Sequence, residues 1–188
     1  MKELVFFLEE QSAKELLLGL LPRLLGEDIN FRCISFEGKH DLEKQLSKKL
    51  RGWLSPGVRF IVLRDQDGSD CYDVKKHLIK ICHKAGKSDV LVRIVCHELE
   101  SWFLGDLQAV ETGLGVNGLS KQQNKRKYRD PDRLQNPKQE LKRLTCNDYQ
   151  QILGSREIGR HLSIQGNRSN SFNAFITGLQ RLVEMEVT

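Results

Sequence analysis

The sequence predicts an α/β fold: a mainly parallel sheet with helices on both faces and a C-terminal helical extension. Within the first 105 residues, short apolar segments typical of buried strands alternate with segments of helical periodicity. Strand and helix in alternation is the pattern of a parallel sheet covered on both faces. Right-handed crossovers between the strands are then expected.

The first strand is predicted at residues 4–8, "LVFFL". Ser12 and Glu15 have the spacing of a capping box, with serine as the N-cap and glutamate at N3. The leucine-rich segment that follows predicts a helix through about Leu25, ending near Gly26.

The second strand is predicted at 31–36, "FRCISF", and the third at 58–63, "VRFIVL". Between them, leucines recur every four residues, which predicts a helix with one buried face. These are Leu42, Leu46, Leu50 and Leu54.

The next helix is predicted to begin after Asp70, which can act as its N-cap with Asp73 at N3, and to stop at Gly86. Its apolar face consists of Val74, Leu78, Ile81 and Cys82. A fourth strand, "VLVRIVC" at 90–96, leads into "HELESWFLGD". Trp102 and Phe103 in that block are predicted to be core residues rather than base-stacking platforms.

The remainder of the chain has a different pattern. Residues 113–140 are rich in Gly, Asn, Gln and basic residues, and they predict loops and short helices. A final helix from about Asn170 is predicted to pack back on the sheet. Its apolar face consists of Phe172, Phe175, Ile176, Leu179, Leu182 and Val183. We expect an α/β core at 1–112 and a basic loop and helical extension at 113–188.

Composition narrows the functional classes. A chain of 188 residues with 39% hydrophobic and 29% charged residues is typical of one globular domain. No apolar stretch is long enough to span a membrane, and the start does not resemble a signal peptide, so a cytoplasmic protein is expected. The chain has five cysteines, an odd number, and no CxxC pair, so a disulfide framework is not expected. Two Cys-His dipeptides occur, at 82–83 and 96–97, but adjacent residues of a strand point to opposite faces, so a zinc site is not expected either.

The net charge of +5 comes from one segment. Residues 121–143 contain nine basic residues and three acidic ones. Such a segment can hold a nucleic acid through phosphate contacts, or it can be an ordinary solvated surface. The residues predicted to bind nucleic acid are Lys121, Lys125, Arg126, Lys127 and Arg129.

Acidic residues follow three of the predicted strands. Glu9 follows the first, Asp65 and Asp67 end the third in "IVLRDQD", and Glu98 and Glu100 follow the fourth. In an open α/β sheet, ligands bind beyond the carboxyl ends of the strands. We therefore expect these carboxylates to meet at one edge.

Carboxylates that converge raise one another's pKa, and a divalent cation removes that cost. Oxygen ligands select Mg²⁺ or Mn²⁺ rather than zinc, and two such ions can clamp a phosphodiester. The alternative for Asp65 and Asp67 is a plain polar turn. For Glu98 and Glu100 it is a solvated strand edge or a helix start.

The segments "FLEEQSAKELL" and "IVLRDQD" resemble the TOPRIM domain of topoisomerases, primases and overcoming-lysogenization-defect nucleases. More narrowly, "HELESWFLGD" and "NPKQELKRL" resemble an uncharacterised family of small bacterial TOPRIM-like proteins, often encoded beside an ATPase in phage-defence clusters. This narrower resemblance covers most of the chain. It implies a TOPRIM-like (Rossmann-like) fold and a role in phage defence or abortive infection with an ATPase partner.

By this resemblance Glu9 matches the TOPRIM glutamate, Asp65 and Asp67 match the DxD, and Glu98 and Glu100 match acids of the family's own block. Two positions depart from the TOPRIM pattern. Glu10 stands where glycine is usual, and Ala13 stands where a second acid often occurs.

The sequence as a whole favours a Mg²⁺- or Mn²⁺-dependent nuclease that binds one or two ions. Glu9, Asp65 and Asp67 are the expected primary ligands, and Glu98 and Glu100 are expected at a second ion. Glu9 is also a candidate general acid or base. Lys138 is a candidate for stabilising charge on the phosphate, the alternative being a solvent-exposed helix lysine.

Two other functions remain open from the sequence. A receiver-like module would be phosphorylated at Asp65, but that function leaves Asp67 and the basic segment unexplained. A non-catalytic regulatory or binding subunit of an ATPase complex would retain the acidic site as a vestige. A homo-oligomer is compatible with each of these functions.

Overall fold

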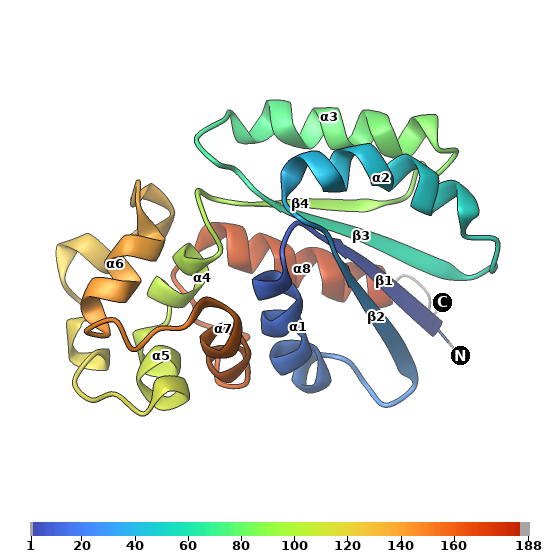
Figure 1. Cartoon of the computed structure of the whole chain (residues 1–188). Helices are drawn as coiled ribbons and strands as arrows, with labels where there is room; N and C mark the ends of the chain where they lie inside the picture. The colour runs from blue at the N-terminus through green and yellow to red at the C-terminus, as the bar shows by residue number, and fades with distance from the viewer. Residues whose placement is uncertain (1, 185–188) are drawn as a thin grey trace.

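A four-stranded, all-parallel sheet forms the centre of the protein, in the order β2-β1-β3-β4 (Figure 1). The computed structural model describes residues 2–184. The strands are β1 (Lys2–Leu8), β2 (Ile29–Ser35), β3 (Val58–Asp65) and β4 (Leu91–Val95). β1 and β3, the two central strands, contribute the most buried residues, as expected for strands covered on both faces.

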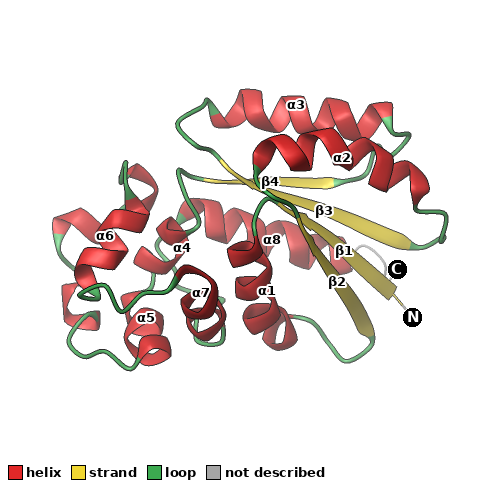
Figure 2. Cartoon of the chain, viewed as in Figure 1, coloured by secondary structure: helices red, strands yellow, loops and turns green. Residues whose placement is uncertain are grey.

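Two helices cover one face of the sheet, α2 (Lys39–Gly52) and α3 (Cys71–Lys84) (Figure 2). Alternate side chains of the strands point toward them, because successive strand residues face opposite sides. Val5, Phe7, Phe60 and Val62 share a hydrophobic cluster with Leu42, Leu46, Leu50, Val74 and Leu78 of the two helices.

The other face is covered by α1 (Gln11–Leu24) and α8 (Asn170–Glu184). Further helices lie beyond them: α4 (Glu100–Leu104), α5 (Leu107–Leu114), α6 (Pro137–Leu144) and α7 (Gln151–Gly159). Between α5 and α6 the chain forms three short 3₁₀ turns, η1 (Ser120–Gln122), η2 (Arg126–Tyr128) and η3 (Pro131–Arg133). The predicted fold class, with its helical extension, is thus confirmed.

A single large hydrophobic cluster joins the sheet to the C-terminal half of the chain. It contains Leu4, Phe6 and Leu8 of β1 together with Trp102, Phe103, Phe172 and Phe175. Trp102 and Phe103 are fully buried, which confirms their prediction as core residues. A boundary between core and extension at residue 112 stays a prediction.

Two local predictions were confirmed and two were wrong. Asp70 accepts hydrogen bonds from the backbone N–H groups of Tyr72 and Asp73, as an N-cap should, and Gly86 with φ 77° follows the end of α3. The capping box at Ser12 does not form. α1 begins at Gln11, so Ser12 lies inside its first turn and Glu15 accepts a hydrogen bond from Gln11 instead.

The second wrong prediction is that Leu54 is buried. It is 88% exposed, because α2 ends at Gly52 before the four-residue period reaches it.

Within residues 2–184, no helix combines the length and the apolar character that a membrane span requires.

Glycine allows α1 and α7 to approach closely. A Cβ built on Gly19 would lie 2.6 Å from the carbonyl oxygen of Arg156 and 2.9 Å from the backbone nitrogen of Arg160. Both obstacles are backbone atoms, so the helices themselves would have to separate. A Cβ on Gly52, at the end of α2, meets nothing within 4 Å.

Gly19→Ala is therefore expected to lower the free energy of unfolding by about 2 kcal/mol or more, because overpacking forces backbone shifts. Gly52→Ala is the matched control and is expected to leave stability unchanged or slightly raised. Urea unfolding of the two variants measures the difference. Equal midpoints for both would show that the α1–α7 contact can accept a methyl group at Gly19.

Candidate active site

The carboxyl ends of β1, β3 and β4 meet at one edge of the sheet, and backbone hydrogen bonds continue past the last strand residues. Glu9 donates its N–H to Leu63 at 3.3 Å, Gln66 donates to Val95 at 3.0 Å, and Asp67 donates to His97 at 3.2 Å. The acidic residues that follow these strands are thereby brought to the same place, which we call the acidic rim: Glu9, Asp65, Asp67, Glu98 and Glu100.

Glu9 is buried at the end of β1. Its Oε2 accepts a hydrogen bond from the backbone N–H of Asp65 at 3.1 Å and lies 3.7 Å from Nε of Arg64. Burial raises the pKa of Glu9 to about 7, and the charge of Asp67 adds to the increase. The Asp65 hydrogen bond and the Arg64 guanidinium only partly offset this effect.

Asp65 is the last residue of β3, and its Oδ2 accepts the backbone N–H of Leu99 at 3.1 Å. Burial raises the pKa of Asp65 well above its usual value, and the charges of Glu9 and Glu100 raise it further. The acidic groups that follow β1 and β4 therefore both act electrostatically on the one that ends β3.

The loops after β3 and β4 hold each other in an uncommon conformation. Asp67 and His97 have φ of 52° and 57°, in the left-handed region that non-glycine residues seldom adopt. The Asp67 N–H bonds to the His97 carbonyl, and the His97 N–H donates to Oε1 of Gln66 at 3.1 Å. Backbone strain of this kind is typical of functional sites, where surrounding contacts maintain it.

Lys138 and Glu98 join α6 to the acidic rim. Glu98 Oε2 accepts the backbone N–H of Lys138 at 3.0 Å, near the start of α6. Nζ of Lys138 donates to Oε1 of Gln151 at 2.6 Å. Lys138 is half-buried rather than a solvent-exposed helix lysine, and its ammonium partner Gln151 is the first residue of α7.

Glu100 is buried at the start of α4 and accepts a hydrogen bond from the Tyr149 hydroxyl at 2.9 Å. Burial raises its pKa, although the Tyr149 hydrogen bond and the charge of Lys138 act in the opposite direction. Glu100 thus lies deeper in the protein than Asp67, whose side chain is 31% exposed.

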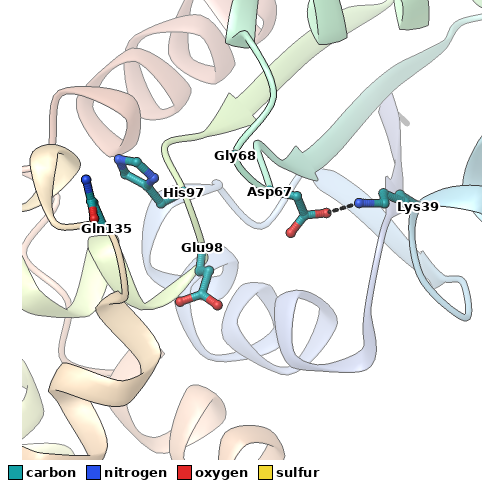
Figure 3. A pocket seen from close by; sticks show the side chains of 6 residues that line it. All are labelled: Lys39, Asp67, Gly68, His97, Glu98 and Gln135. Atoms are coloured by element: carbon teal, nitrogen blue, oxygen red, sulfur yellow. Dashed lines mark hydrogen bonds and ion pairs between the residues drawn. The ribbon is translucent and has the colours of Figure 1, made fainter.

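A cavity of about 550 Å³ opens at the exposed end of the acidic rim. Figure 3 shows Asp67 and Lys39 on one side of it and His97 and Gln135 on the other. Nζ of Lys39 lies 3.1 Å from Oδ2 of Asp67. A second cavity of about 430 Å³ shares Gln135 and is lined by Lys127 and Arg143 of the basic segment.

The side chains of the acidic rim do not all point toward one position. Within residues 2–184, no group of three or more His, Cys, Asp and Glu side chains is placed to hold a metal ion. Each of three rim carboxylates has another partner, because Glu9 and Asp65 accept backbone N–H groups and Asp67 pairs with Lys39.

The chemistry of the acidic rim still fits a divalent cation. The donors are all carboxylate oxygens, which suit Mg²⁺ and Mn²⁺. Burial raises the pKa of Glu9, Asp65 and Glu100, and a cation bound among them would favour their charged forms.

The five predicted nucleic-acid-binding residues are exposed: Lys121, Lys125, Arg126, Lys127 and Arg129. Lys127 also contributes to a local structure, because its Nζ lies 2.6 Å from Oε2 of the buried Glu140. Burial acts to raise the pKa of Glu140, but hydrogen bonds from Arg143, Lys127 and Tyr128 outweigh it and lower the pKa to about 2.

Three residues at the site were not predicted from the sequence: Lys39, His97 and Tyr149. Lys39 reaches the rim because Gly38, with φ 92°, redirects the chain after β2 and donates its N–H to the Glu9 carbonyl at 3.0 Å. Gly38 was the one feature of the sequence that could have indicated this change of chain direction. Nothing local distinguishes Tyr149, which meets Glu100 from 49 residues away.

Comparisons with known proteins agree with this fold. The structure is similar to the C-terminal region of the OLD protein of Burkholderia pseudomallei, with a TM-score of 0.58, 14% sequence identity and 98% of each chain covered. At that identity the likeness supports the TOPRIM-like fold alone. A search of curated proteins gave no match. The family model described as a domain of unknown function, DUF4276, matches residues 8–180, and the chain therefore belongs to the DUF4276 family.

Proposed function

We propose that this protein is a divalent-metal-dependent nuclease that hydrolyses nucleic-acid phosphodiester bonds at the acidic rim. The observation that carries the proposal is the meeting of Glu9, Asp65 and Asp67 at the carboxyl edge of the sheet, where the backbone N–H of Asp65 donates to Glu9. Buried acids with raised pKa values are costly to maintain, and a bound cation would remove that cost.

Glu9, Asp65 and Asp67 would hold the first ion, and Glu98 and Glu100 would complete a second position. When bound, Mg²⁺ or Mn²⁺ supplies an activated water and neutralises charge on the phosphate. In the metal-free protein burial raises the pKa of Glu9 to about 7, and a bound cation would lower it and hold the side chain as a carboxylate ligand. Lys138, half-buried behind the rim, would stabilise negative charge that develops on the phosphate.

The basic segment would hold the nucleic acid beside the acidic rim. The five residues predicted to bind nucleic acid lie in η1, η2 and the turns that flank them, and Lys127 lines the cavity next to the one at Asp67. Lysine and arginine bind phosphate without reading sequence, which suits a surface that guides a strand toward the site. A phage-defence role beside an ATPase partner is part of the same proposal.

The test is incubation of purified protein with plasmid DNA and with RNA, in Mg²⁺, Mn²⁺ or EDTA. We expect nicking or cleavage that requires the metal and disappears in EDTA. The absence of cleavage in all conditions, together with stable capture of an ATPase, would favour the non-catalytic subunit instead. Phosphate transfer to Asp65 would favour the receiver-like function.

A further inference from the structure

Lys39 occupies a position at the acidic rim that the nuclease proposal leaves without a role. It is the first residue of α2, and the hydrogen bond from Gly38 N–H to the Glu9 carbonyl fixes the backbone just before it. Its ammonium group lies 3.1 Å from Oδ2 of Asp67, and its side chain is 35% exposed. Lys39 therefore neutralises one of the carboxylates that the nuclease proposal assigns to a metal ion.

The other cations near the rim are bound to further protein groups. Arg64 is buried and donates to Oε1 of Glu43 at 2.8 Å, and Lys138 donates to Gln151. Both are thereby fixed in place. Lys39 instead extends along the wall of the 550 Å³ cavity, so its flexible side chain has space in which to move.

A divalent cation bound to Asp67 would disfavour the Lys39–Asp67 ion pair. The two positive charges repel each other, and the metal ion neutralises the carboxylate that attracts Lys39. Loss of the Asp67 partner would leave Lys39 facing a cavity that Glu98 also lines (Figure 3), and Glu98 Oε2 already accepts the Lys138 N–H. A negatively charged substrate group is then its most favourable partner, because a charge-assisted hydrogen bond to phosphate is strong.

We propose that Lys39 is a displaceable cation that pairs with Asp67 in the metal-free protein and, when a metal ion takes its place, contacts the phosphate of the nucleic acid in the cavity. This inference rests on the proposed nuclease function. Lys39 then has opposite effects on the two affinities. Lys39 weakens metal binding in the absence of substrate, and it strengthens substrate binding in the presence of metal.

The test compares Lys39→Gln and Lys39→Arg with Lys48→Gln. Lys48 is an exposed lysine of the same helix, so its variant carries the same change of charge. Titration calorimetry with Mn²⁺ alone measures metal affinity. Binding of a short DNA duplex or single-stranded RNA in Ca²⁺, over a range of salt concentrations, measures substrate affinity. Thermal unfolding confirms that each variant is folded.

Lys39→Gln is expected to bind Mn²⁺ about 3- to 10-fold more tightly, because an ion pair that competes with the metal is removed. The same variant is expected to bind nucleic acid about 3- to 10-fold more weakly, and the slope of log K against log[salt] should decrease by about one. Lys39→Arg should retain much of the nucleic-acid affinity, and Lys48→Gln should match the wild type in both measurements.

The proposal is overturned if Lys39→Gln behaves as Lys48→Gln does, or if both affinities change in the same direction. A purely structural role for Lys39 predicts the latter. Failure of the inference is distinguishable from failure of the nuclease proposal. If the wild type binds metal and cleaves nucleic acid while Lys39→Gln is unaltered, only the inference fails. If the wild type binds no Mn²⁺, both fail.

Discussion

Asp65→Asn is expected to abolish metal-dependent cleavage while it stabilises the metal-free protein. Asparagine can still accept the N–H of Leu99, so the local hydrogen bond is retained. The substitution removes a carboxylate of the rim whose pKa is raised by burial and, further, by the charges of Glu9 and Glu100. Cleavage should fall at least about 100-fold, because loss of a metal-holding group removes both charge neutralisation and positioning.

The opposite responses of activity and stability separate this prediction from simple misfolding. We expect the unfolding midpoint in EDTA at about pH 8 to rise for Asp65→Asn, since the wild type must keep a buried acid protonated or carry its charge. Asp28→Asn, at an exposed position before β2, is the control for an equal charge change and should alter neither property. Retained cleavage in Asp65→Asn would refute the assignment of this residue.

Glu9 should make the stability of the metal-free protein depend on pH. Its pKa rises from 4.5 to about 7 on folding, so the folded state binds more protons than the unfolded state between these values. Stability is therefore lost as pH rises through this window. The loss attributable to Glu9 is on the order of 3 kcal/mol, taking roughly 1.4 kcal/mol for each pKa unit.

Glu9→Gln removes this contribution, because a glutamine can accept the Asp65 N–H without titrating. Urea unfolding in EDTA at about pH 5 and about pH 8 should show a smaller loss of stability in Glu9→Gln than in the wild type. Glu27→Gln, exposed before β2, should follow the wild type at both pH values. An equal loss of stability in the wild type and in Glu9→Gln would mean that the pKa of Glu9 is not raised on folding.

The fold was predictable from the sequence because its signals are local and repeated. Uninterrupted apolar runs marked β1 and β3, and the four-residue period of Leu42, Leu46 and Leu50 marked the buried face of α2. The errors occurred where a boundary depends on tertiary context. The turn after β1 is short enough for α1 to begin before Ser12, and α2 ends before Leu54.

The acidic rim was predictable only in part. Parallel strand order places Glu9 and Asp65 together once the topology is known. Their positions at the ends of β1 and β3 were therefore enough to predict that they are neighbours. The partners of the acids were not predictable. The pairing of Lys39 with Asp67 depends on a glycine turn after β2, and the hydrogen bond from Tyr149 to Glu100 depends on how α7 packs. Such contacts join residues far apart in sequence and have no local signal.

The most direct measurement is anomalous diffraction from crystals of the wild type soaked in Mn²⁺. We expect a peak held by Glu9, Asp65 and Asp67 at the carboxyl edge of the sheet, with oxygen–metal distances of about 2.0–2.3 Å and with Lys39 moved away from Asp67. A peak that avoids all three carboxylates, or an unaltered Lys39–Asp67 pair with no peak at saturating Mn²⁺, would contradict the metal-dependent function proposed for this edge.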